Sequence, residues 1–536
     1  MSIVQKHPKR LAIIGGGSSG LITLKYALDV LSDWDITCFE KTGSITGCWG
    51  NPYPGFVSTS TKYTTQFTCY HQYDASVKLD HGNSFSEFFK EGEYGEYLEQ
   101  FAAHFSLRPH VELNTTIEAI ERQDKRGWRL TYSKNTGEHE SKKTADFDQV
   151  ILCTGLVDAP KATNYDVETL DPSQLSVPGE LEKISNHRIV VIGGGESAVD
   201  YANRLANPNL KNEVYLSLKS GIRVSPRYHP IRGVPSDFLR NRLLLSLHEE
   251  LRNRIGRDFV KWRIRYQENV ERLFPSASKP KSEELKSKRT IRKEWAYRLT
   301  CAAKDDLFNM FHNKSDGFLH AVADRRISII GPAENGTLKR FHTFDCDEWV
   351  DVAPDLVVPA IGYQPAFGVL FKNVKLKDFY LGCLHIHYPD LHLVGFARPI
   401  IGNIPTISEM QARYVCNAIA GKIDRSVDIE TRHDRDITKR KKRYGKINTD
   451  AVYPVEMFPY CDQLARQMGC YPSRQSAESF KNWARQQLSP ASTLHYIKGP
   501  HRAPVYMPNL LMFLLWLLVP VSLIYRLKKT GLYDDH

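Results

Sequence analysis

The stretch "LAIIGGGSSGL" at residues 11–21 decides the fold of this chain, because an aliphatic run breaks into three glycines and then resumes in a helical pattern. Gly15, Gly17 and Gly20 fit the spacing GxGxxG between a strand and a helix. In such a turn the first glycine permits the bend, the second lets the backbone approach a pyrophosphate, and the third lets helix and strand pack closely. The stretch therefore predicts a dinucleotide site, although a purely structural strand–helix turn has the same pattern.

An acidic residue stands where such a site needs one. Glu40 ends the next strand, "DITCFE", about 20 residues after Gly20. A carboxylate at that position accepts hydrogen bonds from the adenosine ribose, while the phosphates lie on the N–H groups of the helix N-terminus. Strand, turn, helix and acid thus occur in the order that dinucleotide binding requires.

A second turn of the same kind occurs at "IVVIGGGESAV", residues 189–199. Gly193, Gly195 and Ala198 form the variant GxGxxA, and Glu196 and Ser197 lie between them. The same residue types, in the same strand–turn–helix order, predict a second dinucleotide site.

The second site differs at its ribose position, which falls on Leu218 instead of an acid. Lys219 follows directly and Arg223 lies close by, in "SLKSGIRVSPR". An acid would repel a 2′-phosphate, whereas a lysine and an arginine would pair with it. The second site therefore favours NADPH over NADH, unless these are two solvated bases on a surface loop.

Two nucleotide sites in one chain fit one tightly held flavin, FAD, and one exchanging nicotinamide that reduces it by hydride transfer. We predict an α/β fold with two Rossmann-like dinucleotide-binding domains, a helical insertion and an apolar C-terminal helix. Gly155 and Gly362, each at the end of a strand, mark where the chain crosses between the domains. The predicted FAD domain consists of residues 1–160 and 325–435, and the predicted NADPH domain of residues 161–324, with a helical insertion at about 235–315. A C-terminal extension at 436–507 and a membrane-associated helix at 508–525 follow.

Composition narrows the class of protein. The chain has 536 residues and a net charge of +11, which indicates either a solvated basic surface or attraction to anionic lipid or cofactor phosphate. No nucleic-acid-binding motif is present. The ten cysteines form no CxxC pair, and neither they nor the histidines show metal-ligand spacing, so we expect reduced thiols and no metal site. The N-terminus lacks the apolar region of a signal peptide, which favours a cytosol-facing protein.

The segment "PNLLMFLLWLLVPVSLIY" at residues 508–525 contains no charged side chain. As a helix it would extend over roughly 27 Å, close to the roughly 30 Å hydrocarbon core of a bilayer. The sequence predicts membrane association through this segment, either as a spanning anchor or as an interfacial helix.

Several further stretches resemble the flavin-containing monooxygenases of the eukaryotic N- and S-oxygenating type. "CFEKTGSITGCWG" (38–50) resembles the family's acid-ended strand followed by Gly-Gly-Leu-Trp, and "STSTKY" (58–63) resembles its Ser-Asn-Ser/Thr-x-Lys segment. "PAIGY" (359–363) is similar to its Ala-Thr-Gly-Tyr linker, and "LHLVGFARPIIGNIPTISEMQARYV" (391–415) to its segment that ends in Gln-Ala-Arg. "YIKGPHRAPVYM" (496–507) is similar to its late Gly-Pro-x-x-Pro-Tyr segment. The resemblance extends over nearly the whole chain.

The resemblance implies FAD and NADPH as cofactors and two sets of contact residues. The FAD set is Gly15, Gly17, Ser18, Ser19, Gly20, Glu40, Cys48, Trp49, Thr59, Ser60 and Gln411. The NADPH set is Gly193, Gly195, Glu196, Ser197, Ala198, Lys219 and Arg223. Trp49 could equally be a core aromatic, and Thr59 and Ser60 could belong to a polar strand.

Three departures from the family pattern concern its chemistry. Residues 164–188 lack the fingerprint Phe-x-Gly-x-x-x-His-x-x-x-(Tyr/Phe). Thr59 stands at the position of the active-site asparagine and lacks its amide, and Cys48 and Thr46 replace a leucine and a glycine. These changes put in doubt how well a reactive flavin is protected from water.

The resemblance implies an NADPH- and O2-dependent monooxygenase that oxygenates a soft nitrogen or sulfur nucleophile through a C4a-(hydro)peroxyflavin. Its partners would be that small molecule, O2 and, through the tail, a membrane of the endoplasmic reticulum if the cell is eukaryotic. A Baeyer–Villiger oxygenase and a leaky NADPH oxidase that releases hydrogen peroxide remain alternatives. A membrane-tethered flavin-binding protein without turnover is the alternative from outside the enzymes.

Overall fold

The computed structural model describes residues 8–497, apart from 51–52, 76–84, 124–125, 136–139, 158, 229–234, 255–281, 304–310, 335–336, 345–347, 365–369, 372–373, 424–427, 446, 448 and 450–451. The apolar segment at 508–525 lies outside the described residues. Within the described part of the chain, no helix is long and apolar enough to cross a bilayer.

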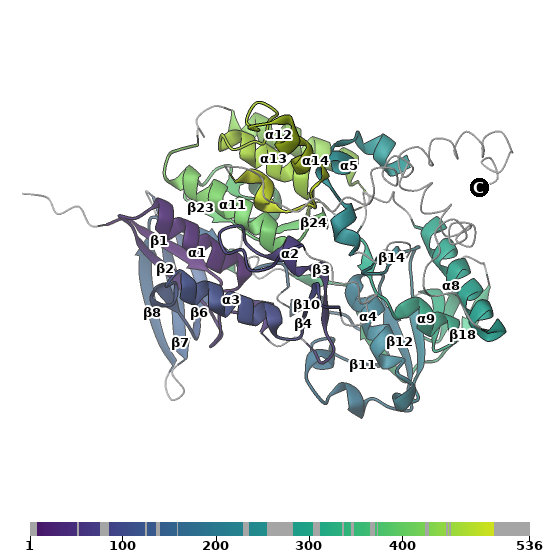
Figure 1. Ribbon diagram of the computed structural model, residues 1–536. Coiled ribbons are helices and arrows are strands. Elements are labelled where there is room, and N and C mark those ends of the chain that lie inside the picture. The colour runs from purple at the N-terminus through teal and green to yellow at the C-terminus, as the bar shows by residue number, and fades with distance from the viewer. Residues whose placement is uncertain are drawn as a thin grey trace, which may run out of the picture.

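The first glycine turn belongs to a seven-stranded sheet with helices α1 (Ser18–Val30) and α11 (Ile404–Ile419) packed against each other beside it (Figure 1). Its strands follow the order β21 (Phe379–Tyr380), β22 (Leu384–His385), β23 (Leu391–Leu393), β9 (Gln149–Leu152), β1 (Arg10–Ile14), β2 (Asp35–Phe39) and β5 (Val111–Glu112). The strands from β23 to β5 pair in parallel. Residues 11–14 of β1 are buried, as expected for a central parallel strand covered on both faces.

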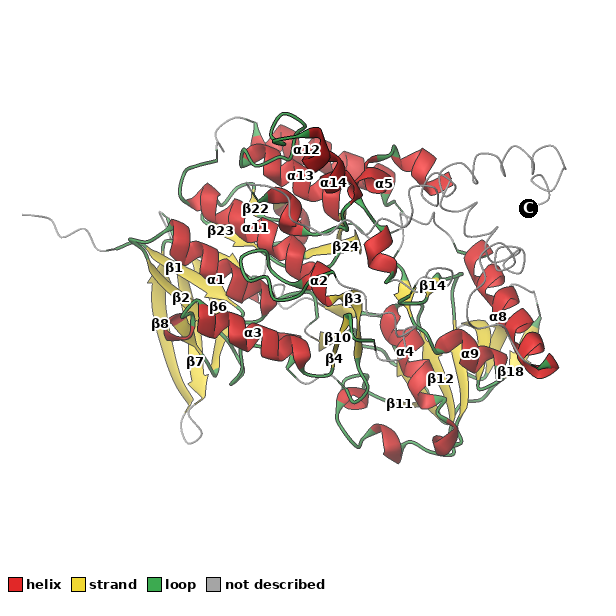
Figure 2. Cartoon of the chain, viewed as in Figure 1, coloured by secondary structure: helices red, strands yellow, loops and turns green. Residues whose placement is uncertain are grey.

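The second glycine turn belongs to a separate seven-stranded sheet. Its order is β11 (Glu168–Thr169), β19 (Leu356–Pro359), β12 (Arg188–Ile192), β13 (Glu213–Ser217), β16 (Ile327–Ala333), β17 (Arg340–Thr343) and β18 (Trp349–Asp351). Helices α4 (Glu196–Leu205), α9 (Phe318–Ala323) and α8 (Glu283–Cys301) lie beside it (Figure 2). The two sheets confirm the predicted α/β fold with two dinucleotide-type domains.

Smaller elements complete the described chain. A three-stranded antiparallel sheet consists of β6 (Thr115–Arg122), β7 (Trp128–Asn135) and β8 (Glu140–Phe147). Two short strand pairs are β3 (Val57–Thr61) with β4 (Phe88–Lys90), and β14 (Val224–Ser225) with β15 (Asn313–Lys314). Helix α2 (Lys62–Thr65) follows β3, and helix α3 (Glu93–His104) follows β4. Figure 1 shows β3 and β4 between the two large sheets.

The chain crosses between the sheets twice, next to Gly155 and Gly362. The two crossings pair as the antiparallel strands β10 (Ala159–Pro160) and β20 (Tyr363–Gln364). Both glycines have positive φ angles, +77° and +101°, a conformation that glycine adopts without strain. The predicted crossing points are therefore confirmed.

The predicted return to the first domain at residue 325 is wrong. Strands β16 to β19 belong to the second sheet, and β16 pairs with β13 so that Ile327 lies opposite Val214. The chain returns only after Pro359. The sequence predicts a strand at 326–332 correctly, but the sheet that a strand joins depends on hydrogen bonds to segments more than 100 residues away.

The insertion predicted at about 235–315 is largely helical where it is described, although it also includes the short strand β15. It contains α5 (Arg242–Ser246) and α8, whereas residues 255–281 lie outside the described residues. Helix α5 packs on α13 (Met457–Gln467) and α14 (Phe480–Leu488). The buried Arg252 donates two hydrogen bonds to Glu456, at 2.6 and 2.7 Å. The start of the insertion is thus fixed to the C-terminal part of the chain.

The segment predicted as a C-terminal extension, 436–507, is instead part of the first domain as far as it is described. Helix α12 (Ile429–Arg443) leads to β25 (Tyr453–Glu456), which pairs in parallel with β24 (Ala397–Ile401). Helix α13 buries Cys461 and Leu464 in the core that α1 and α11 share. These apolar side chains need a partner surface, and α11 provides it.

Candidate functional site

The first glycine turn has the geometry that its sequence predicts. A Cβ on Gly15, whose φ is +103°, would lie 2.8 Å from the carbonyl oxygen of Cys153, and a Cβ on Gly20 would lie 1.8 Å from that of Gly15. Gly17 caps the N-terminus of α1 with extended backbone, and the Cα of Gly47 lies 3.3 Å from where its Cβ would be. The turn therefore requires glycine for packing, and it leaves the N-terminus of α1 free of side-chain caps.

Glu40 holds this turn in place. Its Oε2 accepts a hydrogen bond from the N–H of Gly16 at 2.6 Å, and its Oε1 accepts one from the N–H of Thr42 at 2.9 Å. Only 6% of Glu40 is exposed. The carboxylate thus lies beside the turn, where a ribose is expected, and at the same time orders the loop.

The other predicted FAD contacts fall into an accessible and a buried group. Trp49, Thr59 and Ser60 line a cavity, and Cys48 is exposed. Ser18 and Ser19 are less than a tenth exposed and bond to Tyr94 and Ser408, at 3.0 and 2.9 Å. Ser18 and Ser19 therefore stabilise the turn from its buried side.

Gln411 is fully buried. Its side-chain oxygen accepts the N–H of Gly395 at 2.9 Å, and its nitrogen donates to Tyr460 at 2.8 Å. Both ends of the amide are thus engaged inside the protein. The structure gives Gln411 a role in fixing the loop at Gly395, and the flavin contact that the resemblance implies stays a prediction.

The second glycine turn is tight at one glycine and open at another. A Cβ on Gly193, whose φ is +139°, would lie 2.3 Å from the carbonyl oxygen of Ala360. A Cβ on Gly195, the N-cap of α4, would meet no atom within 4 Å. Ala198 is fully buried behind the turn. The open space at Gly195, at a helix N-terminus, fits a phosphate group.

The two bases predicted to bind a 2′-phosphate lie apart. Lys219 is exposed and lines the cavity. Arg223 is only 4% exposed and is not among the residues that line it. The structure therefore places Lys219, and not Arg223, where a bound nucleotide would reach it.

A cavity of about 1100 Å³ joins the two domains. It is lined by Trp49, Thr59 and Ser60 from the first domain and by Gly193, Gly195, Glu196, Ser197 and Lys219 from the second. Ligand sites for drug-sized molecules occupy roughly 300–1,000 Å³, so this cavity has room for more than one such molecule. Residues from both predicted cofactor sites thus face one space.

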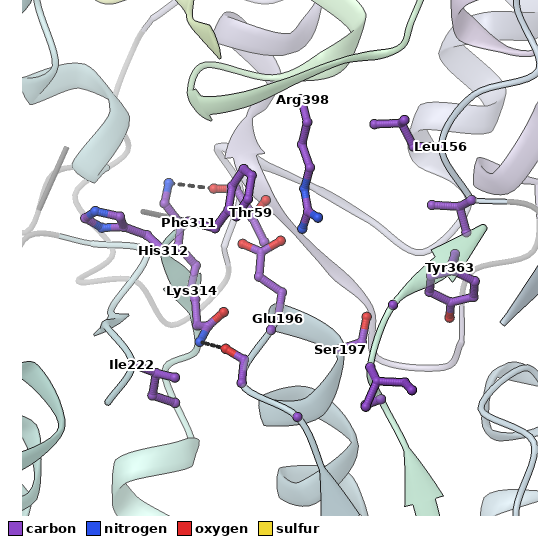
Figure 3. A pocket seen from close by; sticks show the side chains of 18 of the residues that line it. Thr59, Leu156, Glu196, Ser197, Ile222, Phe311, His312, Lys314, Tyr363 and Arg398 are labelled. Atoms are coloured by element: carbon purple, nitrogen blue, oxygen red, sulfur yellow. Dashed lines mark hydrogen bonds between the residues drawn. The ribbon is translucent and has the colours of Figure 1, made fainter. Parts of the chain in front are cut away.

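Two cations hold the backbone next to Thr59. Lys314 donates to the carbonyl oxygen of Thr59 at 2.6 Å and forms an ion pair with Asp237 (Figure 3). Arg227 donates to the carbonyl oxygens of Val57 and Ser58, at 2.5 and 2.8 Å. Both cations follow or belong to the pair β14–β15 of the second domain, so the NADPH domain positions the strand that carries Thr59.

The Lys314–Asp237 pair is buried, and each residue acts on the pKa of the other. Burial lowers the pKa of Lys314, and Asp237 opposes that shift. Burial also raises the pKa of Asp237, but Lys314, Arg240 and the N–H of Thr61 together outweigh burial, and the pKa lies below its usual value. Neither residue was predicted from the sequence, where both lie in a segment with no motif.

Glu196 and Arg398 also enter the cavity. Glu196 is the first residue of α4, and Figure 3 shows its carboxylate directed towards Thr59 and Phe311. Burial in the cavity raises the pKa of Glu196, while Lys314, Arg398 and Arg227 oppose the shift. Sequence analysis assigned Glu196 to the NADPH contacts and missed Arg398, although "GFARPIIGN" places a charge in an otherwise apolar stretch.

The sequence profile of the family described as flavin-binding monooxygenase-like matches residues 8–299. The chain belongs to this family. It is 24% identical to 4-hydroxybenzoate brominase (decarboxylating) of Pseudoalteromonas luteoviolacea, over 87% of this chain and 84% of that protein. It is 25% identical to human flavin-containing monooxygenase 2, over 87% and 83% of the two chains.

Solved structures of similar fold include S-allyl-L-cysteine S-oxygenase from Allium sativum, with a TM-score of 0.53 and 16% identity over 86% of this chain and 89% of that one. Cyclohexanone monooxygenase from Rhodococcus sp. Phi1 bound to NADP+ has a TM-score of 0.54 and 17% identity, over 86% and 98% of the two chains. As a member of the flavin-binding monooxygenase-like family, the protein is an FAD-dependent NADPH monooxygenase.

The cofactors fit the residues present. FAD would be held at Gly15, Gly17 and Glu40, with Trp49 and Thr59 in the adjoining cavity. NADPH would be held at the N-terminus of α4, in the open space beside Gly195, with Lys219 nearby.

We predict that Gly195→Val abolishes nicotinamide binding without disturbing the fold. The backbone of Gly195, at φ −86° and ψ 176°, suits a β-branched residue, and its side chain would occupy the open space that a phosphate needs. The affinity for NADP+, measured by calorimetry on the flavin-loaded protein, should fall at least about 10-fold. Flavin content and melting temperature should match the wild type. Gly193→Val is the contrasting variant, because its Cβ would clash with Ala360, and it should lose stability. Undiminished NADP+ binding in Gly195→Val would contradict the site.

We predict that Lys219→Ala weakens NADPH binding while leaving NADH nearly unchanged. Loss of one charge-assisted contact at an exposed position should raise the dissociation constant of NADPH about 5-fold. Arg223→Ala, the matched control, should lower thermal stability without changing the NADPH-to-NADH ratio, because Arg223 is buried. Equal effects of Lys219→Ala on both nicotinamides would show that this lysine does not contact the 2′-phosphate.

Proposed function

We propose that this protein uses NADPH and O2 to oxygenate a soft nitrogen or sulfur nucleophile of a small molecule. The observation that carries the proposal is that the second nucleotide turn and the flavin-side residues Trp49, Thr59 and Ser60 line one cavity. FAD, when bound, accepts a hydride from NADPH and activates O2. One oxygen atom then goes to the nucleophile and the other leaves as water, while NADPH becomes NADP+ and a proton is taken up.

The relatives give this proposal its chemistry and also its limits. Mouse dimethylaniline monooxygenase [N-oxide-forming] 2 is 24% identical to this chain, and its name states N-oxide formation. The brominase is named for the decarboxylating bromination of 4-hydroxybenzoate, which is a different reaction from N-oxide formation. Cyclohexanone monooxygenases share the fold at 17–18% identity, which does not favour ketone oxygenation here. The family membership argues against a flavin-binding protein without turnover.

Each domain has a separate task in this proposal. The second domain binds NADPH on α4 and also fixes Thr59 through Lys314, so the residue at the position of the family's asparagine is held from the NADPH side. Trp49 packs edge-on against Tyr94, with ring centroids 4.9 Å apart, which fixes the indole at the cavity wall. Exclusion of water from this cavity is what separates oxygenation from peroxide release.

The direct test is a comparison of oxygenated product with hydrogen peroxide, for each NADPH consumed. The flavin-loaded protein should oxidise NADPH with uptake of one O2, and a tertiary amine or thioether should divert part of the flux from peroxide to N-oxide or sulfoxide. The oxygen in the product should come from labelled O2 and not from water. Absence of NADPH oxidation, or peroxide as the sole product with every amine and thioether tried, would refute the proposal.

Peroxide release should be substantial, and Thr59→Asn should reduce it. Thr59 has no amide to donate, and the family fingerprint is missing from residues 164–188. Restoring one hydrogen-bond donor should raise the product-to-NADPH ratio about 2- to 10-fold, the value of one hydrogen bond. Thr59→Val, which keeps the size but removes the hydroxyl, is the control and should not improve coupling. One-to-one coupling in the wild type would show that another element replaces the asparagine.

We further propose that residues 508–525 attach the protein to a membrane, with the catalytic part facing the cytosol and, in a eukaryotic cell, on the endoplasmic reticulum. The support is the absence of charge from this stretch and the cluster Arg526, Lys528 and Lys529 that follows it. Exposing its Leu, Ile, Val, Phe and Met side chains to water would forgo roughly 1.5–3 kcal/mol each.

Truncation before Pro508 should move the protein from the membrane pellet to the soluble fraction. Flavin content and NADPH oxidation should stay within about twofold of the full chain, because both glycine turns lie in the domains formed by residues 8–497. A full-length protein that remains soluble without detergent would contradict the proposal. So would a truncated protein that loses its flavin.

A further inference from the structure

Arg398 projects into the cavity from the flavin side. It belongs to β24, the strand that precedes α11, and it is exposed to the cavity. The guanidinium carbon lies 4.0 Å from the centroid of the Phe311 ring, which holds the charge by a cation–π contact. Figure 3 shows the side chain entering the space between Leu156 and Phe311. Arg398 is therefore held inside the cavity and does not extend into bulk solvent.

The charge of Arg398 is not matched by a carboxylate. Among the residues that the structure describes, Arg398 has no hydrogen-bond or ion-pair partner. The cavity is lined by four cations, Lys219, Arg240, Lys314 and Arg398, and by two carboxylates, Glu196 and Asp237. Asp237 is paired with Lys314. Glu196 is close enough to act on Arg398 electrostatically, but it is not in ion-pair contact.

Holding the charged guanidinium in this position costs desolvation free energy, which a bound anion would offset. Burial lowers the pKa of Arg398, while the carboxylate of Glu196 opposes this shift. An arginine stays charged in any case, because its pKa is far above neutrality. A planar fork of N–H donors that faces a cavity matches the two oxygens of a carboxylate.

The two cofactors have their phosphate positions elsewhere. The nicotinamide phosphates belong at the N-terminus of α4, beside Gly195 and Lys219, on the opposite domain. The flavin phosphates belong at the N-terminus of α1, whose glycines do not line this cavity. Arg398 lies between the apolar side chains of Phe311 and Leu156 (Figure 3), and Ile361 and Tyr363 line the same cavity. A charged anchor beside an apolar wall fits a substrate with an acidic end and a carbon skeleton.

We propose that the substrate carries a carboxylate, and that Arg398 binds this group while the apolar part lies against Phe311 and Leu156. The inference rests on the proposed function, since it assigns the class of nucleophile that is oxygenated: an acid that also contains a thioether or amine. The carboxylate takes no part in the oxygen transfer. It sets the orientation in which the nucleophilic atom meets the flavin.

The test compares 4-(methylthio)benzoate with 4-(methylthio)benzamide, which have the same shape but differ in charge. Each is titrated into the oxidised flavin-loaded protein without NADPH, and binding is followed by the change in flavin absorbance. The wild type should bind the acid at least about 10-fold more tightly than the amide. Arg398→Gln should weaken binding of the acid about 10- to 100-fold and leave the amide unchanged. Arg398→Lys, which keeps the charge but not the fork, should fall between them.

A second arm separates the substrate from the nucleotide as the source of the bound anion. NADP+ affinity in Arg398→Gln should equal that of the wild type, whereas Lys219→Ala should weaken NADP+ and leave the acid unaffected. A drop in NADP+ affinity with no change in acid binding would overturn the proposal, as would equal wild-type affinity for acid and amide. If acid and amide both weaken equally in Arg398→Gln, the residue only shapes the cavity, which also overturns it.

The failure of this inference and of the proposed function are distinguishable. If the wild type converts the neutral amide to its sulfoxide and shows no preference for the acid, the function stands and the carboxylate assignment fails. If it binds the acid through Arg398 but oxidises neither thioether, the anion site stands and the proposed oxygenation of sulfur fails.

Discussion

The architecture depends on a steric constraint that acts at both nucleotide turns, where a Cβ would collide with a nearby backbone carbonyl oxygen. In the first turn a Cβ on Gly20 would lie 1.8 Å from the carbonyl oxygen of Gly15, and in the second a Cβ on Gly193 would lie 2.3 Å from that of Ala360. Only glycine fits these two positions, which lets each turn pass close to the adjoining backbone. The N-termini of α1 and α4 consequently remain free of side-chain caps, with their positive ends available for phosphate.

This constraint also explains which parts of the molecule the sequence predicts well. Trp49 and Thr59 are assigned through the resemblance to the family. Both turns, the acid at Glu40, the crossings at Gly155 and Gly362, and the cavity position of Lys219 follow from local patterns of strand, glycine and helix. In each case the residue type is dictated by backbone geometry within a few residues. Because such geometry depends on neighbouring residues alone, these features can be located without knowing the rest of the fold.

The features that sequence analysis misplaced depend on distant partners. Residues 326–332 look like a strand of either domain, and only the pairing of Ile327 with Val214 assigns them to the second sheet. Arg223 lies four residues beyond Lys219, yet its backbone carbonyl pairs with Asn313 and its side chain turns inward. Gln411 is polar but fully buried, because Gly395 and Tyr460 satisfy its amide. Polar side chains in such positions cannot be distinguished from ligand contacts by residue type alone.

The contacts between the domains show why the cavity has an unequal distribution of charge. Lys314 binds the carbonyl oxygen of Thr59 and pairs with Asp237. Arg227 binds the carbonyl oxygen of Val57 and pairs with Asp316. Both cations therefore hold the domains together and are not available to a ligand. Removing one member of the buried pair Lys314–Asp237 would leave a buried charge, at a cost of about 3–5 kcal/mol, which keeps Thr59 in a fixed place. Arg398 has no such task. Among the described residues, no hydrogen bond or ion pair neutralises its charge in the cavity.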